Sequence, residues 1–518
     1  MKRRLLFRLV QQGLLLVVGF LLSTGASFGQ ALTVSGRISS ANNEAIPAAT
    51  VLVKGTTIGT ASNADGSYSL SVPGPTSVLL FSSVGFVSQE ATVGQRTEIN
   101  VTLAENVKAL NDVVVVGYGT VKKSDLTGSV ASVKQKDLTP GAIVNVQQAL
   151  QGRVAGVQVY QKSGEPGSAI SVKIRGASSI TAGNDPLYVI DGMPVNNDAP
   201  ITGNGSGSVG NVNPRNPLNS LNPADIESIE VLKDASATAI YGSRGSNGVV
   251  IITTKRGNTG SMQLNYSAQY GRQSVAHYPE MLTGQQYHDV LNALVDAGGA
   301  DATQRVPDNY VDTNWQEALY QTAPTQTHDL SVSGGAGNTK YYASLGYFDQ
   351  QGVVINSATR RYSARLNLEN RVTQKYAFGV TLNTSYIKDK LNSTGDQGIN
   401  ENANALYAAI SYDPTVPIYN PDGTYFRSPA MTIDNPVALI NGQYAVSDSY
   451  RTFGNLYGEY YVLPSLSVRL RVGGDVNLSQ RNEWLDPITR AGQQNTAWGT
   501  ILSGNRNYYL GEGTLNFN

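Results

Sequence analysis

The sequence predicts a mainly β protein made of a β-sandwich, an α+β globule and a long antiparallel sheet. Three observations support this prediction. Short segments of alternating apolar and polar residues recur along most of the chain, which is the pattern of strands with one buried face. Clusters of Gly, Asn, Asp and Pro separate these segments, as expected for turns. The 518 residues include 54 Gly and 28 Tyr, a composition that suits turn-rich β-structure with many aromatic positions.

The composition also excludes several classes of protein. The chain has no Cys, which rules out a disulfide framework and thiolate metal sites. Lys+Arg and Asp+Glu are both 38, so no net charge is available to attract nucleic acid. A chain of 518 residues is too long for one ordinary domain, and we therefore divide it into regions.

Residues 1–29 are predicted to be a signal peptide. Four basic residues precede an apolar core from Leu14 to Leu22, and small residues follow, with cleavage expected near Gly29. The alternative is a membrane anchor, but the apolar run is shorter than the roughly 18 residues that a spanning helix needs. No later segment has the length and hydrophobicity of a membrane helix. If the exported chain enters a membrane again, we expect it to do so as a β-barrel.

Residues 30–104 are predicted to form the β-sandwich. The segments LTVSGRISS, ATVLVKGT, GSYSLSV, SVLLFSSVG and EINVTL alternate as short strands, with turn residues such as Asp65-Gly66 and Pro73-Gly74 between them. This stretch resembles the carboxypeptidase-regulatory-like domain. The resemblance implies a binding or spacer module without peptidase activity, and the segment contains no His that could ligate a catalytic zinc.

Residues 105–120 form a linker that contains the stretch LNDVVVVGYGT. Its four β-branched residues favour an extended strand. We expect no turn and partner strand to follow at hairpin spacing, so the strand would join a sheet elsewhere. One interpretation places that sheet in another protein; the alternative is that the valines add a strand to the sandwich or to the next region.

Residues 121–257 are predicted to be the α+β globule. Val146, Leu150 and Val154 have helical spacing and predict a helix that ends near Gly156. PLYVIDGMPV predicts two short strands around the turn Asp191-Gly192. Further on, the sequence predicts a strand over 226–232, a short helix ending at Tyr241-Gly242, and a final apolar strand over 249–254.

Four blocks in this part of the chain identify a family. DVVVVGYGT, SVKIRGASSI, PLYVIDGMPV and NPADIESIEVLKDASATAIYGSRGSNGVVIITTKRG resemble, in order and spacing, the plug region of SusC/RagA-type TonB-dependent outer-membrane transporters. The resemblance places the following residues in the plug signature: Arg175, Gly176, Asp191, Gly192, Tyr241, Gly242, Arg244, Gly245, Asn247 and Gly248.

Residues 258–518 are predicted to be the first part of a transmembrane antiparallel β-barrel. In RYSARLNLEN, Tyr362 and Leu366 share one face while Arg365 and Glu369 share the other, and such segments recur with one apolar and one polar face. A soluble antiparallel sheet gives the same alternation, and the signal peptide and the plug blocks decide in favour of the barrel. We expect about eight strands here, whereas barrels that hold a plug have about 22. The sequence is therefore expected to be the N-terminal portion of a longer protein.

The sequence gives no indication of catalysis, of a metal site or of a cofactor. The three histidines, His277, His288 and His328, have no metal-ligand spacing. The glycine-rich runs Gly205–Gly210 and Gly242–Gly248 are not followed by the helix that a phosphate-binding loop requires. We therefore interpret the second run as a tight turn before the last strand of the plug, and the chain as a non-enzyme.

The family resemblance implies import across the outer membrane of a Gram-negative bacterium, with the sandwich in the periplasm. It implies two protein partners, the energy-supplying protein TonB with its ExbB–ExbD motor and a SusD-like surface lipoprotein, and an oligosaccharide or peptide as substrate. Because an extended segment ahead of a plug suits β-strand addition, we assign Asp112, Val113, Val114, Val115 and Val116 as the TonB-binding segment. Two alternatives remain, a transducer that regulates transcription through an anti-sigma partner and an adhesive or structural surface protein.

Overall fold

The computed structural model describes most of the chain beyond the predicted signal peptide. The described residues are 32–40, 44–83, 86–104, 113–116, 119–122, 130–135, 145–161, 163–177, 179, 183–195, 215–392, 404–429, 431–494 and 496–517. The predicted signal peptide, Asp112 and the glycine-rich run 205–210 lie outside these ranges. The chain divides into two compact units, one made of Met1–Val113 with Lys122–Ser124 and the other of Val114–Val121 with Asp125–Asn518.

The first unit contains a sandwich of two small sheets. One has the order β4-β1-β7 and the other β3-β2-β5-β6. The bounds are β1 Leu32–Ser40, β2 Thr50–Val53, β3 Gly59–Ala61, β4 Ser67–Val72, β5 Val78–Ser82, β6 Gln89–Thr92 and β7 Val101–Leu103. The alternating apolar residues of both sheets point inward, so Val34, Ile38, Val51, Leu79 and Phe81 share one dry core.

The second unit begins with the α+β globule, built on a five-stranded sheet of order β10-β15-β16-β13-β14. Its strands are β10 Val130–Lys134, β13 Leu187–Ile190, β14 Met193–Val195, β15 Ile226–Leu232 and β16 Val249–Thr254. The central strands β16 and β13 run parallel and are buried on both faces, which explains their continuous apolar sequences. A separate hairpin pairs β11 Val157–Gln161 with β12 Ile170–Ile174.

Helical structure in the globule is shorter than the sequence predicted. The predicted helix before Gly156 is a single 3-10 turn, η3 Gln148–Leu150, although Val146, Leu150 and Val154 are all buried. Gly152 and Gly156 adopt positive φ, which ends the helix and turns the chain into β11. The remaining helical pieces of the globule are η4 Pro217–Ser220, η5 Pro223–Asp225, α3 Ala235–Thr238 and η6 Ala239–Gly245.

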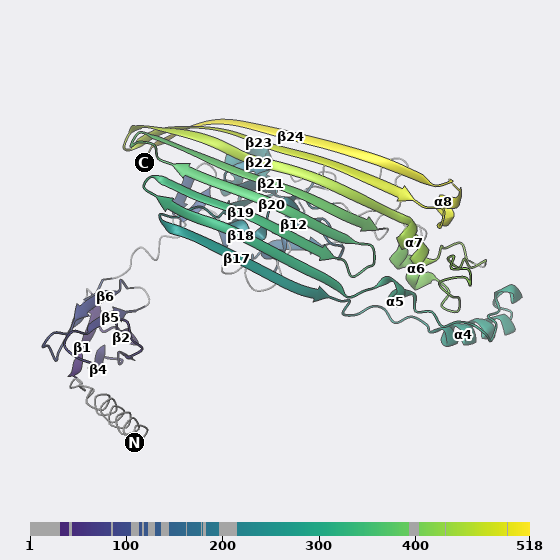
Figure 1. Cartoon of the computed structure of the whole chain (residues 1–518), viewed down its shortest axis with the longest axis horizontal. Helices are drawn as coiled ribbons and strands as arrows, with labels where there is room; N and C mark the ends of the chain where they lie inside the picture. The colour runs from purple at the N-terminus through teal and green to yellow at the C-terminus, as the bar shows by residue number, and fades with distance from the viewer. Residues whose placement is uncertain are drawn as a thin grey trace, which may run out of the picture. The chain divides into compact units, whose positions relative to one another are not determined.

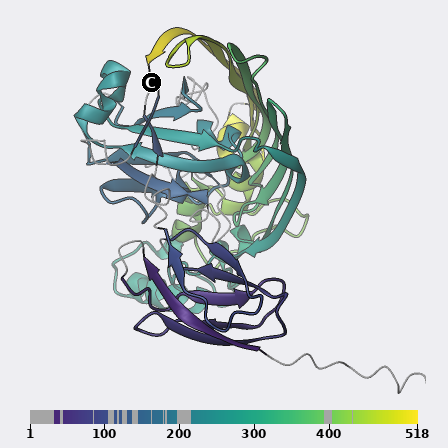
Figure 2. The same cartoon turned by 90° about the vertical axis from the view of Figure 1, so that its left-hand side faces the viewer.

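Eight antiparallel strands then form one curved sheet, here called the wall (Figure 1). They are β17 Gly260–Gln273, β18 Ala323–Ala336, β19 Thr339–Gln351, β20 Ala358–Asn370, β21 Tyr376–Asn392, β22 Gln443–Leu463, β23 Leu466–Leu485 and β24 Trp498–Phe517. The predicted alternation is confirmed in β20, where Arg365 and Asn367 are buried while Tyr362 and Leu366 are exposed. The globule lies against the concave face of the wall (Figure 2).

The two ends of the wall differ in the length of their connections. At one end, short turns join β18 to β19, β20 to β21 and β22 to β23. At the other end, long segments join β17 to β18, β21 to β22 and β23 to β24, and the short segment 352–357 joins β19 to β20. The long segments contain α4 Gly284–Asp296, η7 Ala302–Gln304, α5 Trp315–Leu319, α6 Ala405–Ser411, α7 Pro436–Gly442 and α8 Arg490–Gln494. Within the described residues, no helix has the length and apolar character to cross a membrane.

Three of these long-segment helices, α5, α6 and α7, share a hydrophobic core of their own. Trp315 packs edge-on against Tyr412 with ring centroids 4.8 Å apart, and Leu319, Leu439 and Ile440 are buried beside them. We call this group of segments the loop cluster. Its core makes it a structured body at one end of the wall.

Candidate functional site

The predicted TonB-binding segment forms part of a two-stranded sheet. Val113–Val116 is strand β8, and it pairs with β9, Gly119–Lys122. The expectation that no partner strand follows was wrong. Only Gly117 and Tyr118 separate the two strands, which is hairpin spacing, and Thr120 and Val121 supply a second β-branched pair. In a two-stranded sheet each strand keeps one edge without a β-partner.

The turn between β13 and β14 joins the globule to the wall. Asp191 and Gly192 have φ of 49° and 80°, as in the tight hairpin turns that need two residues of positive φ. The Asp191 carboxylate accepts hydrogen bonds from the Thr254 backbone amide (3.1 Å) and hydroxyl (2.6 Å). On the other side, the guanidinium of Arg365, from strand β20 of the wall, lies 3.0 Å from Asp191 Oδ2.

Asp191 stays charged although it is buried. Burial alone would raise the pKa of its carboxyl, but the charges of Arg365 and Arg256 and the hydrogen bonds from Thr254 outweigh that effect and lower the pKa. The neighbouring Gly192 carbonyl accepts a hydrogen bond from Arg471 of β23 at 3.1 Å. A Cβ at Gly192 would lie 2.6 Å from the same guanidinium, so glycine permits the close contact.

A second group of buried charges joins the globule to the wall near η4. The Arg215 guanidinium lies 3.0 Å from Asp389 of β21 and 3.6 Å from Glu165 of the globule. Burial alone would lower the pKa of Arg215. The two carboxylates raise it by more than burial lowers it, so the net shift of the pKa is upward. Arg361 of β20 and Arg451 of β22 donate to the carbonyls of Asn219 and Pro217 at 2.9 and 2.8 Å.

Further polar contacts extend along the same interface. Asn222 donates to Asp329 of β18 at 2.6 Å, and the Tyr342 hydroxyl of β19 donates to Asp225 at 2.8 Å. A polar cavity of about 480 Å³ lies beside Asp191, lined by residues that include Arg256, Glu369 and Arg471. The globule is thus held to the wall by hydrogen bonds and ion pairs.

The other predicted signature residues form turns and local contacts. Arg175 and Gly176 both have positive φ after β12, and Arg175 pairs with Asp234 at 2.5 Å on a partly exposed surface. Asn247 donates to the Gly183 carbonyl at 2.8 Å. Gly248 has φ of 91°, and a Cβ there would lie 2.6 Å from Ile174, so this glycine permits close packing. The run from Tyr241 to Gly248 leads directly into β16, with no helix after it.

Arg244 is the member of this run that reaches the wall. Its Nη1 donates to the Tyr508 hydroxyl of β24 at 3.2 Å, and its guanidinium stands 5.3 Å from the ring centroid. Sequence reasoning missed the wall residues that meet the globule, namely Arg361, Arg365, Asp389, Arg451 and Arg471. Their signal was present, because a charged residue on one face of an alternating strand predicts a polar partner on that side. Across the described ranges, no group of three or more His, Asp or Glu residues could hold a metal ion.

Comparison with known proteins identifies these regions. Residues 122–249 match the TonB-dependent Receptor Plug Domain family, and residues 34–115 match the CarboxypepD_reg-like domain family. The chain is 37% identical over 510 residues to TonB-dependent receptor P3 of Formosa agariphila, covering 96% of this chain and 47% of the relative. It is 35% identical over 496 residues to TonB-dependent receptor SusC of Bacteroides thetaiotaomicron, covering 89% of this chain and 46% of SusC. The chain belongs to the TonB-dependent receptors of the SusC/RagA type.

Solved structures agree with this assignment. The RagAB peptide importer in its open-open state matches with a TM-score of 0.60 and 27% identity, over 78% of this chain and 46% of that one. Its closed-closed state matches with a TM-score of 0.59 and 29% identity, over 70% and 42%. The chain spans about half the length of the curated relatives that it matches. The globule is therefore the plug of a SusC/RagA-type receptor, and the wall is part of its β-barrel.

Proposed function

We propose that this chain takes part in the import of oligosaccharides or peptides across the outer membrane, with energy supplied by TonB. The observation that carries the proposal is the way the plug is held. The turn between β13 and β14, at one side of the plug sheet, is fixed to the wall by the buried contacts of Asp191. Strand β10 is the edge strand on the opposite side and, among the described strands, pairs only with β15. The plug can thus open from the β10 side while the β13–β14 side remains attached.

The position of the predicted TonB-binding segment supports the same proposal. Residues 112–116 precede β10 in the chain, so a pull on this segment acts on this edge strand before it acts on the attached β13–β14 side of the plug. The edge of β8 that faces away from β9 can accept a strand from TonB, with main-chain hydrogen bonds providing affinity. A two-stranded hairpin has little stability of its own, so it can open or rearrange at small cost.

Proline substitutions test this assignment. Val114→Pro with Val116→Pro removes two backbone donors from β8 and should abolish TonB binding and uptake, because proline cannot take part in a strand ladder on its donor side. TonB binding is measured by pull-down from membranes, and surface expression of the variant should equal that of the wild type.

The matched control separates strand addition from loss of the hairpin. Thr120→Pro disrupts β9 and leaves the donors of β8 intact, so TonB binding should persist. Unchanged uptake in the β8 double variant would refute the assignment. Equal loss of uptake in the β8 double variant and in Thr120→Pro would show that uptake requires the intact β8–β9 hairpin, and not specifically the free edge of β8.

The proposal includes a SusD-like lipoprotein as partner at the loop end of the wall. The matching RagAB structures are named as a peptide importer, which supports a peptide as one substrate class. The lipoprotein partner is what the family resemblance implies. Growth of deletion and wild-type strains on defined glycans and on peptides separates the two classes. Equal growth on every substrate would contradict a role in uptake.

A further inference from the structure

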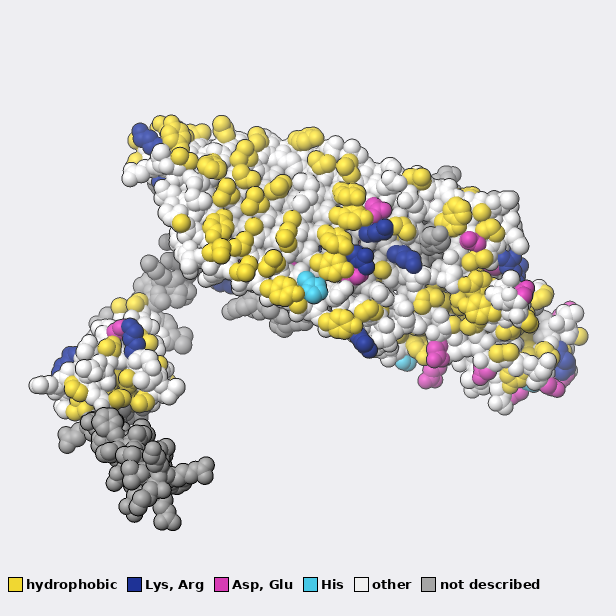
Figure 3. All heavy atoms as spheres, viewed as in Figure 1, with side chains coloured by type: hydrophobic (Ala, Val, Ile, Leu, Met, Phe, Trp, Pro, Cys, Tyr) yellow, Lys and Arg dark blue, Asp and Glu magenta, His cyan; other side chains and the backbone are white. Residues whose placement is uncertain are grey.

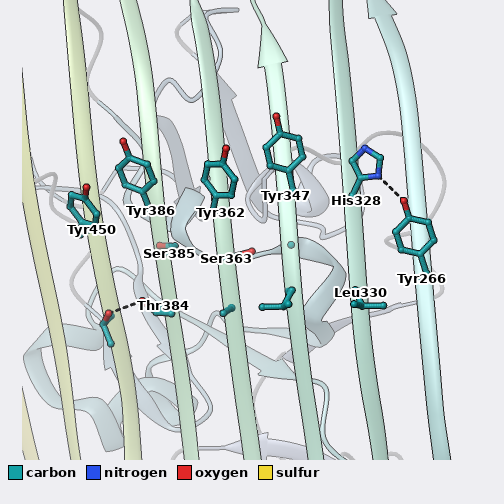
Figure 4. Close-up of a pocket in the computed structure, with 14 residues that line it drawn as sticks. Tyr266, His328, Leu330, Tyr347, Tyr362, Ser363, Thr384, Ser385, Tyr386 and Tyr450 are labelled. Carbon is teal, nitrogen blue, oxygen red and sulfur yellow. Dashed lines mark hydrogen bonds between the residues drawn. The ribbon is translucent and has the colours of Figure 1, made fainter.

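A row of six ring side chains crosses the outward face of the wall (Figure 4). Each of the strands β17 to β22 contributes one ring, and neighbouring ring centroids are 4.6 to 6.3 Å apart. The six residues are Tyr266, His328, Tyr347, Tyr362, Tyr386 and Tyr450. In Figure 4 the hydroxyls of Tyr347, Tyr362, Tyr386 and Tyr450 all point the same way along the strands. Strand directions place these hydroxyls toward the loop end of the wall.

A hollow of about 600 Å³ lies on the short-turn side of this row. It exists because three neighbouring strands carry short side chains at paired positions, Ala364, Thr384 and Thr452. The next outward pair in this direction, Leu366 and Leu382, is large and exposed. The hydroxyls of Thr384 and Thr452 bond each other at 2.9 Å, so the surface of the hollow is largely apolar. Its chemistry suits an acyl chain.

A band of charged residues lies on the loop side of the row. Asp349, Arg360, Lys388 and Asp448 are paired in register across four strands. The hydroxyls of Tyr347 and Tyr386 donate to Asp349 and Asp448 at 3.0 and 2.5 Å, and Arg360 pairs with Asp349 at 2.9 Å. In Figure 3 this face of the wall shows basic and acidic side chains grouped beside hydrophobic ones.

Two cations on the loop side of the row remain available to a ligand: Lys388 of this band and Lys390, the next outward residue of β21. Lys388 forms no hydrogen bond or ion pair within the described part of the chain, and Lys390 contacts only the amide oxygen of Asn356 at 3.1 Å. Both point outward from β21, and residues two apart on one face of a strand are about 7 Å apart. One phosphate group can therefore contact both ammonium groups.

We propose that this face of the wall binds a phosphate-bearing, multi-chain lipid of the outer leaflet. This lipid is lipid A: its phosphate lies against Lys388 and Lys390, its sugar part lies along the tyrosine row, and an acyl chain fills the hollow. From the loop end to the short-turn end of the wall, the lysines, the tyrosine row and the hollow follow one another in the same order as the phosphate, the head group and the acyl chains of such a lipid. Aromatic rings mark the membrane interface, and cations at that level attract lipid phosphates. A free phosphate would leave the apolar hollow unexplained.

This site is separate from the plug and its function. It requires that the wall be inserted in the outer membrane with its long connections outside, the orientation usual for such barrels. Loss of uptake in a TonB-segment variant leaves lipid binding unchanged, so the two proposals fail independently.

The experiment measures binding of lipid A that carries phosphate to the full protein purified in detergent, by native mass spectrometry. Lys388→Glu with Lys390→Glu should weaken binding by about tenfold or more, since each surface cation contributes on the order of a few-fold in affinity. Lys375→Glu, in a short turn at the opposite end of the wall, is the control and should bind as the wild type does. Dephosphorylated lipid A should bind the wild type as weakly as the phosphorylated lipid binds the reversed variant.

A second variant tests the hollow without changing charge. Ala364→Leu with Thr384→Leu fills the space and should lower lipid A binding, while the heat-induced mobility shift of the folded barrel stays normal. Equal binding of phosphorylated lipid A by the wild type and the charge-reversed variant would overturn the proposal. A second result would also overturn the proposal: the filled variant binds lipid A as the wild type does, and inorganic phosphate displaces the lipid. Together these results would indicate a site for free anions.

Discussion

At the scale of single residues, Asp191 connects two parts of the molecule that lie far apart in the sequence. Its backbone makes the turn between β13 and β14, and its carboxylate is shared between Thr254 of the plug and Arg365 of the wall. The sequence predicted the turn, because Asp-Gly between apolar segments is a strong hairpin signal. It could not predict the partner, since Arg365 is 174 positions away and only the folded sheet brings it close.

The Asp191→Asn variant should destabilise attachment of the plug by about 3 kcal/mol, because it leaves the buried guanidinium of Arg365 without its counter-charge. The measurement is the urea concentration at which the plug becomes protease-sensitive while the barrel stays folded. The control is Asp234→Asn, which breaks the partly exposed pair with Arg175 and should cost less than about 1 kcal/mol. Equal effects of the two variants would contradict the importance of the buried pair.

A comparison of the wild type with the Asp191→Asn variant at different pH values gives a further test. The folded-state pKa of Asp191 lies below its ordinary value, so its contribution to stability is present above that ordinary value and is lost as pH falls through the folded-state pKa. The wild type should therefore lose plug stability on acidification in this range. The Asn variant should show a smaller loss.

At the scale of secondary-structure elements, the sequence predicted the wall well and the small helices poorly. The eight expected strands are present, because alternation over more than ten residues is a long and consistent signal. Near the loop ends of β22 and β23, residues such as Ser447 and Asn482 are polar on both faces, so alternation no longer marks where these strands end. Strands β3, β6, β9, β10 and β11 were missed because three to five residues carry too little pattern.

A cross-link between β10 and β15 tests whether the edge strand must leave the plug. Ser132 and Glu230 are paired in register, and Glu230 is a buried carboxyl whose pKa is raised by burial, so its removal should be tolerated. Ser132→Cys with Glu230→Cys should block uptake when oxidised and restore it when reduced. These would be the only two Cys among the 518 residues of the chain.

The control for this cross-link is Gln158→Cys with Lys173→Cys, a register pair within the β11–β12 hairpin. It joins two strands that are already neighbours along the chain and leaves β10 free, so uptake should continue in both redox states. If uptake persists while a disulfide joins β10 to β15, β10 stays in place during transport.

At the scale of the whole molecule, the chain is organised as two units with separate cores. The sandwich buries its own apolar residues, from Val34 to Leu103, without help from the plug or the wall. The plug, in contrast, meets the wall through charges and hydrogen bonds and also shares its apolar core with Phe453 of β22. The sequence predicted the separate sandwich from five of its seven strands. The plug–wall contacts depend on the curvature of the sheet, which no local pattern contains.

A fragment of residues 31–104 should fold alone. We expect a single cooperative transition in thermal or urea unfolding followed by circular dichroism, as usual for small domains with one core. Phe81→Ala, at the centre of the core, should destabilise the fragment by about 3 to 5 kcal/mol. A fragment without a cooperative transition would show that the sandwich depends on the rest of the chain.

The loop cluster has a consequence for how such receptors diverge. Since Trp315, Leu319, Leu439 and Ile440 pack among themselves, the surface of these long connections can change by substitution or insertion while the strands below keep their pairing. Under the proposed function, recognition of a new substrate can then be acquired through these outer residues without rebuilding the barrel.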